Sequence, residues 1–159
     1  MKVGILSDSH DNVPLLDAAM AVFEERGAER LVHAGDFVAP FAAKRLLALG
    51  VPVVAVFGNC DGEKRVVSQL LPGIVAGARH ETIGGTRFVI VHSIDWLDDS
   101  DRSGADVIVC GHTHQAGVSE GKPLVINPGE CGGWVTGRST AAMLDTDTLH
   151  AEILDLKAP

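Results

Sequence analysis

Five short hydrophobic runs recur along the chain, and a polar segment follows each of them. The runs cover residues 3–7, 31–34, 53–57, 88–91 and 107–110. Continuous apolar runs of this length are typical of strands that are buried on both faces, as in parallel sheets. The pattern therefore predicts buried strands whose ends carry polar side chains.

Helices are expected between the first three of these runs. Apolar residues recur at helical spacing over residues 15–23, where Pro14 suits the first helical turn and Asp11 or Asn12 can cap it. A second helix is expected over residues 41–49. Strands that alternate with helices predict parallel pairing and right-handed crossovers.

A different pattern occupies the rest of the chain. We expect a short helix, a hairpin about a Gly-Gly turn, an acidic segment that is a weak helix or a loop, and three further strands that pair antiparallel. These elements cover, in order, residues 63–71, 81–88, 95–103, 124–126, 140–145 and 149–154. The simplest fold that contains all of these elements has two sheets flanked by helices.

Composition and charge narrow the class of protein. The 159 residues suit one domain, and 46% hydrophobic residues with a mean hydropathy of +0.20 indicate a globular chain. No apolar run approaches the roughly 20 residues of a membrane span, and a strand pattern stands where a signal peptide would, so we expect a cytoplasmic protein without a membrane partner. The net charge of −8 disfavours extended nucleic acid as a partner.

The polar segments after the five runs are rich in metal-ligand side chains. They contribute Asp8, His10, Asp36, Asn59, His92, His112 and His114. Because ligands bind at the carboxyl ends of strands in open α/β sheets, we expect these side chains to converge. Their imidazoles, carboxylates and amide suit manganese, iron, cobalt, nickel or zinc better than calcium or magnesium. Seven ligands exceed the needs of one ion and predict two ions that share a carboxylate, an arrangement that clamps phosphoryl groups.

Each segment also has a structural explanation when it is taken alone. The Asp8-Ser9-His10 segment can cap the helix that follows, and Gly35-Asp36 can be a turn. A lone histidine at a strand end, such as His92, is often a core residue. The Gly111-His112-Thr113-His114 segment has fewer structural reasons to exist, and the five segments together favour the metal site.

The order of the motifs resembles that of a known family. The motifs are Asp8-Ser9-His10, Gly35-Asp36, Gly58-Asn59-Cys60-Asp61, His92 and Gly111-His112-Thr113-His114. This series is similar to that of the calcineurin-like metallophosphoesterase superfamily, and the short chain with its Asn127-Pro128-Gly129 segment resembles the compact stand-alone phosphodiesterase branch. The resemblance implies that residues 1–159 form one metallophosphoesterase domain with an α/β fold, an αββα four-layer sandwich of two mixed sheets flanked by helices.

The resemblance also implies a role for each ligand. Asp8, His10 and His114 would hold one metal ion, Asn59, His92 and His112 the second, and Asp36 would bridge the two. With two divalent transition-metal ions, manganese first and nickel, cobalt, iron or zinc as alternatives, the chain would hydrolyse small phosphodiesters by in-line attack of a metal-activated hydroxide. A phosphomonoesterase of the same mechanism and a non-catalytic protein-binding scaffold are the alternative functions, and homo-oligomerisation stays open.

Three positions depart from the superfamily pattern. Cys60 stands where many members carry a histidine that protonates the leaving group, so its thiol occupies the general-acid slot and we expect modest activity that favours good leaving groups. Asp61, at the end of the same motif, is expected to orient its neighbours. Ser93 follows His92 in place of glycine, which predicts a different local turn. Glu130 replaces a small hydroxyl residue, either as a surface carboxylate or as a pocket residue that repels dianions.

Overall fold

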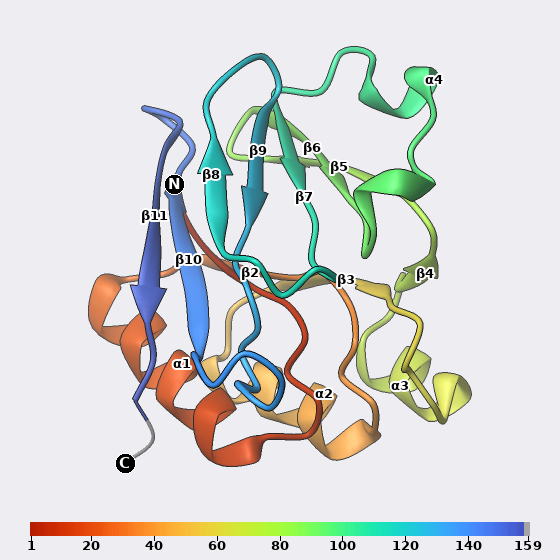
Figure 1. Cartoon of the computed structure of the whole chain (residues 1–159), viewed down its shortest axis with the longest axis vertical. Helices are drawn as coiled ribbons and strands as arrows, with labels where there is room; N and C mark the ends of the chain where they lie inside the picture. Colours follow the sequence, from red (N-terminus) through yellow and green to blue (C-terminus); the bar gives the residue numbers. More distant parts are fainter. Residues whose placement is uncertain (158–159) are drawn as a thin grey trace.

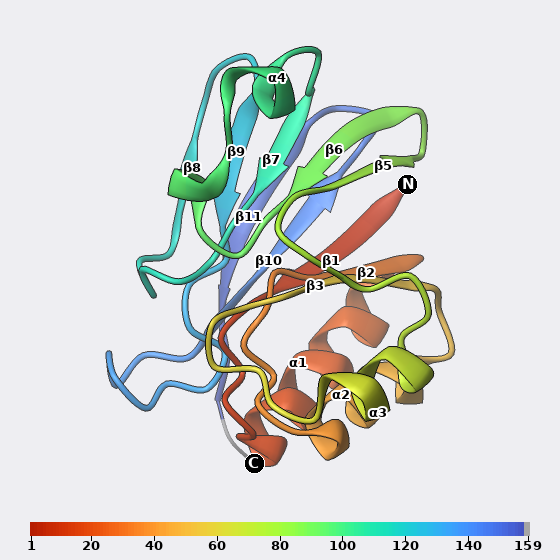
Figure 2. The same ribbon diagram turned by 90° about the vertical axis from the view of Figure 1, so that its right-hand side faces the viewer.

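Two β-sheets lie face to face in the computed structural model, which describes residues 1–157. Ala158 and Pro159, which the expected domain includes, lie outside the described residues. The first sheet has six strands in the order β11-β10-β1-β2-β3-β4, and the second has five in the order β5-β6-β7-β9-β8. Three helices, α1 to α3, cover the outer face of the first sheet, and the short helical segments η2 and α4 flank the second (Figures 1 and 2). The expected αββα sandwich of two mixed sheets is thereby confirmed.

The first half of the chain builds the centre of the first sheet. Its parallel strands are β1 (Lys2–Leu6), β2 (Arg30–His33), β3 (Val53–Phe57) and the short β4 (Val75–Ala76). The connecting helices are α1 (Val13–Arg26), α2 (Pro40–Leu46) with the 3-10 turn η1 (Leu47–Leu49), and α3 (Lys64–Leu70). The predicted alternation of strands and helices is confirmed.

The residues before α1 do not cap it as predicted. Nδ2 of Asn12 donates to the carbonyl oxygen of Gly132 at 2.7 Å, and Oδ1 of Asp11 accepts from the backbone N–H of Ala39 at 3.2 Å. The helix begins without a side-chain cap, and Pro14 occupies its first turn. Both polar side chains therefore tie neighbouring loops together and leave the helix end uncapped.

The second sheet consists of strands from the later part of the chain. They are β5 (Arg79–Ile83), β6 (Thr86–Ile90), β7 (Val107–Val109), β8 (Gly117–Ser119) and β9 (Leu124–Asn127), while β10 (Thr140–Asp145) and β11 (His150–Asp155) return to the first sheet. The predicted hairpin is confirmed as β5 and β6. The prediction that the tail strands pair antiparallel is confirmed for β10 and β11, and it holds for one edge of β9, which pairs antiparallel with β8 but parallel with β7. Apolar periodicity reports burial, and it carries no information on the direction of the partner strand.

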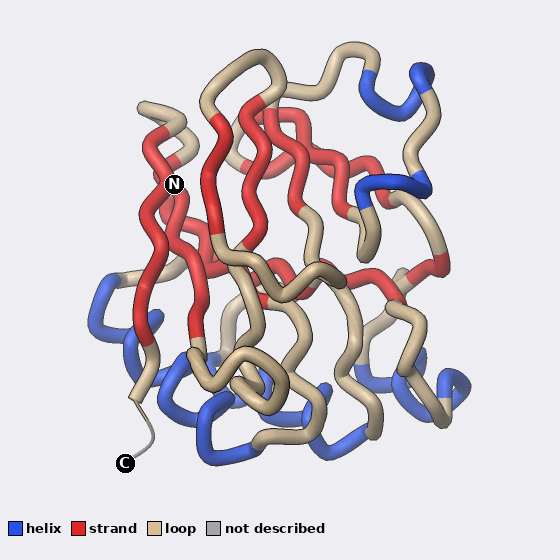
Figure 3. The backbone as a smooth tube through the Cα atoms, viewed as in Figure 1, coloured by secondary structure: helices blue, strands red, loops and turns tan. Residues whose placement is uncertain are grey.

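The pleat of the strands divides the apolar side chains into layers. In β1, Val3 and Ile5 face the second sheet, whereas Leu6 packs with the helices α1 to α3. On the far side of the second sheet, the 3-10 turn η2 (Ile94–Trp96) and α4 (Asp99–Arg102) are short, and loops supply much of the covering (Figure 3). No helix within residues 1–157 is long and apolar enough to cross a membrane.

Candidate metal centre

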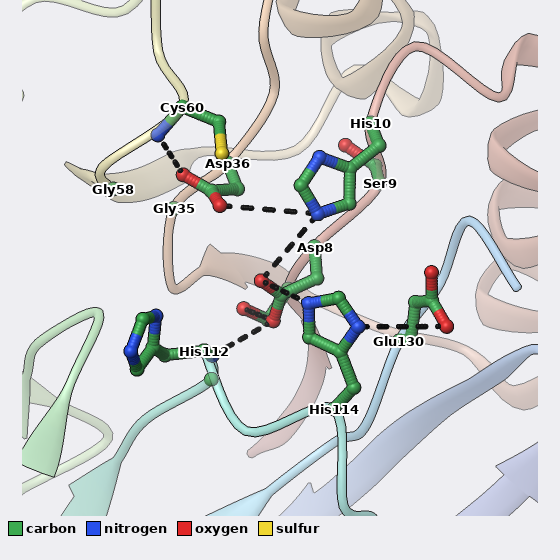
Figure 4. A network of polar contacts seen from close by, with 12 residues as sticks. Asp8, Ser9, His10, Gly35, Asp36, Gly58, Cys60, His112, His114 and Glu130 are labelled. Carbon is green, nitrogen blue, oxygen red and sulfur yellow. Dashed lines mark hydrogen bonds and ion pairs between the residues drawn. The ribbon is translucent and has the colours of Figure 1, made fainter. Parts of the chain in front are cut away.

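The first group of predicted ligands converges from the loops that follow β1, β2 and β7 (Figure 4). Oδ1 of Asp8 lies 3.4 Å from Nε2 of His114 and 3.9 Å from Nε2 of His10. Nε2 of His10 lies 3.8 Å from Oδ2 of Asp36. Ligand atoms bound at about 2.0–2.2 Å to a tetrahedral ion are roughly 3.3–3.6 Å apart, so this spacing is close to that of an ion site.

Two atoms of this group lack any partner of their own. Oδ1 of Asp8 and Nε2 of His10 are buried, and neither has a hydrogen-bond partner among residues 1–157. A buried polar atom without a partner destabilises the fold by about 1–3 kcal/mol. A cation between a carboxylate oxygen and an imidazole nitrogen removes this penalty, so the residues present fit a metal ion.

The other oxygen of Asp8 is held firmly. Oδ2 accepts a hydrogen bond from the Ser7 hydroxyl at 2.6 Å and from the backbone N–H of His112 at 3.0 Å. These bonds turn Oδ1 toward the two imidazoles. Burial raises the pKa of Asp8 above its ordinary value, although the Ser7 hydrogen bond opposes the change. A bound cation would favour the charged carboxylate that burial disfavours.

His92 supplies an independent test of whether the second group fits an ion. Its Nδ1 lies 2.9 Å from the carbonyl oxygen of Ala34, which can only accept, so Nδ1 carries the proton. On the other side of the ring, Nε2 lies 2.8 Å from Oδ1 of Asn59 and 3.4 Å from Oδ2 of Asp36. Because both oxygens accept hydrogen bonds, a proton or a cation must lie between them and Nε2.

The electrostatics of the second group agree with this geometry. Burial lowers the pKa of His92, but the neighbouring Asp36 carboxylate outweighs burial and raises it overall. Burial likewise raises the pKa of Asp36, yet hydrogen bonds from His92 and the Cys60 backbone bring it down to about 2. Nδ1 of His112 lies 3.0 Å from the same Asn59 oxygen. Asp36 thus lies between the two groups of ligands.

The backbone of the ligand loops is strained. Five of the seven predicted ligands have a positive φ: Asp8 (52°), His10 (42°), Asp36 (60°), His112 (68°) and His114 (60°). Side chains other than glycine enter this left-handed region at a cost of order 1–3 kcal/mol, and Asp and His do so more readily than most. The surrounding structure therefore holds these loops in conformations that the isolated segments would avoid.

Two glycines of the motifs make room for the carboxylates. A β carbon at Gly58 would collide with Oδ1 of Asp36, and one at Gly111 would collide with Oγ of Ser7 and lie within 2.6 Å of Oδ2 of Asp8. Neither glycine has the positive φ that glycine alone tolerates easily. Their place in the Gly-Asn and Gly-His motifs therefore reflects close approach to Asp36 and Asp8.

Asp61 joins two of the ligand loops, as an orienting residue should. Its carboxylate accepts backbone N–H bonds from Gly58 (2.6 Å), Phe37 (2.7 Å), Val38 (2.9 Å) and Asp36 (3.1 Å). One buried side chain thus ties the loop after β2 to the loop after β3. The position of Asp36 depends directly on this contact.

Cys60 lies at the edge of the site with its side chain exposed. Its backbone N–H donates to Oδ1 of Asp36 at 2.8 Å, and its Sγ accepts a hydrogen bond from Nδ2 of Asn59 at 3.2 Å. Desolvation and the neighbouring Asp36 raise the pKa of the Cys60 thiol. The thiol is therefore protonated at neutral pH, and it is a weak acid.

Glu130 contradicts the expectation of a surface carboxylate, because it is fully buried. Its oxygens accept from the backbone N–H groups of Val135 and Thr136, both at 2.9 Å, and from the Thr136 hydroxyl. Oε2 lies 3.6 Å from Nδ1 of His114 (Figure 4). Its proximity to a ligand was missed from the sequence, where the only signal was its departure from the family pattern after Asn-Pro-Gly.

His33, on β2, also orders the ligand loops. The backbone N–H of Gly35 donates to Nδ1 of His33 at 3.1 Å, so the proton of this ring is on Nε2, which lies 3.1 Å from the Ser9 hydroxyl. Burial lowers the pKa of His33 to about 3, so the ring is neutral. It stacks on Phe37 with ring centroids 3.8 Å apart. The side chain connects the loop after β1 with the loop after β2.

A cavity of about 470 Å³ opens onto the predicted ligands. Its floor contains His10, Asp36, Asn59, His112 and His114, with Cys60 beside them. Trp134 and Val135 line it from the segment between β9 and β10. His92 and Asp8 are fully buried beneath this surface. The site can therefore receive a small molecule directly over the ligand atoms.

Comparison with known proteins agrees with this geometry. Residues 1–149 match the model of the calcineurin-like phosphoesterase superfamily domain. The chain is 36% identical over 156 residues to phosphodiesterase MJ0936 of Methanocaldococcus jannaschii, covering 92% of this chain and 94% of that protein. A solved archaeal phosphodiesterase superposes with a TM-score of 0.89 at 35% identity, over 98% of this chain and all of the other.

A more distant structure shares the fold alone. Vps29 of Chaetomium thermophilum superposes over the full length of both chains with a TM-score of 0.70, at 15% identity. The family match and the first relative rest on much higher similarity and cover nearly the whole chain. Together with the convergent ligand loops, they show that this chain belongs to the calcineurin-like phosphoesterase superfamily, a family of metal-dependent phosphoesterases.

Proposed function

We propose that the protein hydrolyses small phosphodiesters with two divalent transition-metal ions. Asp8, His10 and His114 would hold the first ion, Asn59, His92 and His112 the second, and Asp36 would bridge them. The observation that carries the proposal is the set of buried ligand atoms without partners, Oδ1 of Asp8 and Nε2 of His10. Nε2 of His92, which faces the side-chain oxygens of Asn59 and Asp36, supports the second ion.

The chemistry would be divided between the ions and the chain. When bound, divalent cations polarise the phosphoryl oxygens and make hydroxide available near neutral pH. Asp61 and His33 hold the ligand loops in place through hydrogen bonds. Glu130 lies 3.6 Å from Nδ1 of His114 and would orient that ring. The Cys60 thiol is the candidate proton donor to the leaving oxygen. Because the pKa of this thiol is raised, we expect a preference for esters whose leaving group needs little protonation.

The lining of the cavity favours a diester over a monoester. The two ions would bind the phosphate oxygens of either ester. Among residues 1–157, no lysine or arginine lines the cavity, whereas Trp134 and Val135 do, and only a diester has a second ester group that can contact these apolar side chains. Net charge of −8 also disfavours extended nucleic acid. The free cysteines Cys60, Cys110 and Cys131 suit a reducing compartment, and we propose the cytoplasm.

Metal analysis combined with two substrates tests the proposal. Purified protein should contain about two transition-metal ions per chain and hydrolyse bis(p-nitrophenyl) phosphate faster than p-nitrophenyl phosphate. A chelator should abolish both rates, and Mn²⁺, Ni²⁺ or Co²⁺ should restore them. Faster monoester hydrolysis would support the phosphomonoesterase alternative. Protein that binds none of these ions and hydrolyses neither ester would support the scaffold alternative.

Replacing Glu130 should weaken metal binding. Oε2 of Glu130 lies within ion-pair distance of His114, 3.6 Å from its Nδ1. Carboxylates that pair with a ligating histidine orient the ring and raise its basicity, and their removal typically lowers metal affinity about 10–100-fold. We expect a loss of this size for Glu130→Gln, measured as the dissociation constant of Zn²⁺ in competition with a chelator. Glu120→Gln, at an exposed position outside the site, is the matched control and should bind as the parent does. Equal affinities in the two variants would contradict a role for Glu130 at the metal site.

A further inference from the structure

Trp134 stands exposed at the cavity that contains the predicted ligands. The segment between β9 and β10 extends away from the body of the molecule (Figure 2, left). It carries Trp134 and Val135, whose exposed fractions are 67% and 76%. The Trp134 indole is more exposed than Phe41 (57%) and the second tryptophan, Trp96 (48%). Large apolar groups exposed at a cleft are typical of binding surfaces.

The indole is held in place by the ligand loop itself. Its Nε1 donates to the carbonyl oxygen of His10 at 3.1 Å. The base of the same segment is fixed as well, because the backbone N–H groups of Cys131 and Gly132 donate to the carbonyl oxygens of Ser7 and Asp8, both at 3.0 Å. Since the polar atom of the indole is already paired, the rest of the ring offers an apolar π-face.

The charges near the cavity agree with an uncharged ligand group at this place. Arg138, on the same segment, is paired with Asp155 through Nε and Oδ1 at 2.7 Å. Lys64 lies over the Phe57 ring, 5.3 Å from its centroid. Neither cation lines the cavity. Beyond the predicted metal ligands, the side chains that line the cavity are therefore Cys60, Trp134 and Val135, and the indole is the largest of them.

We propose that Trp134 determines substrate specificity by stacking on a planar aromatic ester group of the phosphodiester, such as an aryl ring or a nucleobase. The proposal rests on the phosphoesterase function proposed above. Stacking on an aromatic side chain is sequence-tolerant, because every base and aryl ring has a π-face. The phosphate would face the ligand atoms while its aromatic substituent lies on the indole at the edge of the same cavity.

Binding of monoesters, the products of diester hydrolysis, tests the proposal without turnover. The Zn²⁺-loaded protein is titrated calorimetrically with methyl phosphate, phenyl phosphate and thymidine 5′-monophosphate. The two aromatic esters should bind about tenfold more tightly than methyl phosphate, the size expected for one stacking contact. In Trp134→Leu this ratio should fall to about one, while the methyl phosphate dissociation constant stays unchanged; Trp134→Phe should keep most of the ratio.

Fluorescence gives a second readout that a merely structural role would not produce. In Trp96→Phe, where Trp134 is the single tryptophan, the aromatic esters should quench emission and methyl phosphate should not; in Trp134→Phe, where Trp96 remains, no ester should quench. If only thymidine 5′-monophosphate bound more tightly than methyl phosphate, the contact would be specific for a nucleobase. If phenyl phosphate gained as much affinity as the nucleotide, the indole would accept any planar ring. An unchanged ratio in Trp134→Leu, or equal weakening of all three esters, would overturn the proposal.

These outcomes separate the two proposals. Aromatic binding that depends on Trp134 in a protein that hydrolyses no ester would support the stacking contact and overturn the proposed function. Hydrolysis of diesters, combined with monoester binding that does not depend on Trp134, would support the proposed function and overturn the stacking contact. Zn²⁺-loaded protein that binds neither aromatic monoester would also overturn the stacking contact, and the hydrolysis assay would then decide the proposed function separately.

Discussion

Asp36→Asn is expected to lower kcat/KM for bis(p-nitrophenyl) phosphate by about 1,000-fold or more and to reduce the bound metal below two ions per chain. Asp36 lies between both ligand groups, 3.8 Å from His10 and 3.4 Å from His92, and it would provide the charge that they share. Loss of an ion would remove several kcal/mol of transition-state stabilisation, and each 1.36 kcal/mol is a factor of ten in rate. Steady-state kinetics and metal analysis of the same sample measure the two effects.

The substitution is chosen to change charge and little else. Asparagine has the same shape, tolerates the positive φ of 60° at this position, and can still accept the hydrogen bond from the Cys60 backbone. Asp99→Asn, an exposed change on α4, is the matched control and should keep full rate and metal content. Retention of the parental rate by Asp36→Asn, or a full complement of two ions, would contradict the bridging role.

Asp61→Ala is expected to lower the free energy of unfolding by about 3 kcal/mol or more and the Tm by roughly 10 °C. The carboxylate accepts four backbone hydrogen bonds, and its removal leaves the N–H groups of Gly58, Phe37 and Val38 without their buried partner. Hydrogen bonds to charged groups contribute about 1.5–3 kcal/mol each, and a chain of this size loses about 2–4 °C per kcal/mol. Denaturant unfolding and thermal melts measure the change.

The measurement should be made in the presence of a chelator. A bound metal stabilises the folded state, so a variant that only lost its ions would also melt earlier. Asp95→Ala, which removes an exposed carboxylate, should change the free energy of unfolding by no more than about 0.5 kcal/mol. If the metal-free Asp61→Ala protein were as stable as this control, the loops would not depend on Asp61 as we infer.

Most of the fold could be predicted from local patterns. Apolar runs and helical spacing predicted β1, α1, β2 and β3, and the Gly84-Gly85 pair predicted the β5–β6 hairpin. The parallel pairing of β9 with β7 could not be predicted, nor could the short strands β4 and β8. The direction and partner of a strand are set by contacts distant in sequence, which a local apolar pattern does not record.

Part of the site could likewise be predicted from the sequence, and part could not. The types and order of its side chains indicated two metal ions, because few other chemistries need such a set after successive strands. The buried Glu130, the tautomer of His33 and the anchored Trp134 could not be predicted. Each depends on a neighbour far away in the chain, as when the Trp134 indole meets the His10 carbonyl across 124 positions.

The residue types of the site, and their places after the strands, can be read from the order of residues in the chain. Asp8, Asp36 and His92 each follow an apolar run, and that placement is a local property. Which atoms face one another depends on the folded protein: Oδ1 of Asp8 has no hydrogen-bond partner among residues 1–157, and Asp36 lies between two groups of predicted ligands. Burial, hydrogen bonding and electrostatic repulsion depend on packed neighbours, and packing brings together loops that are far apart in the chain.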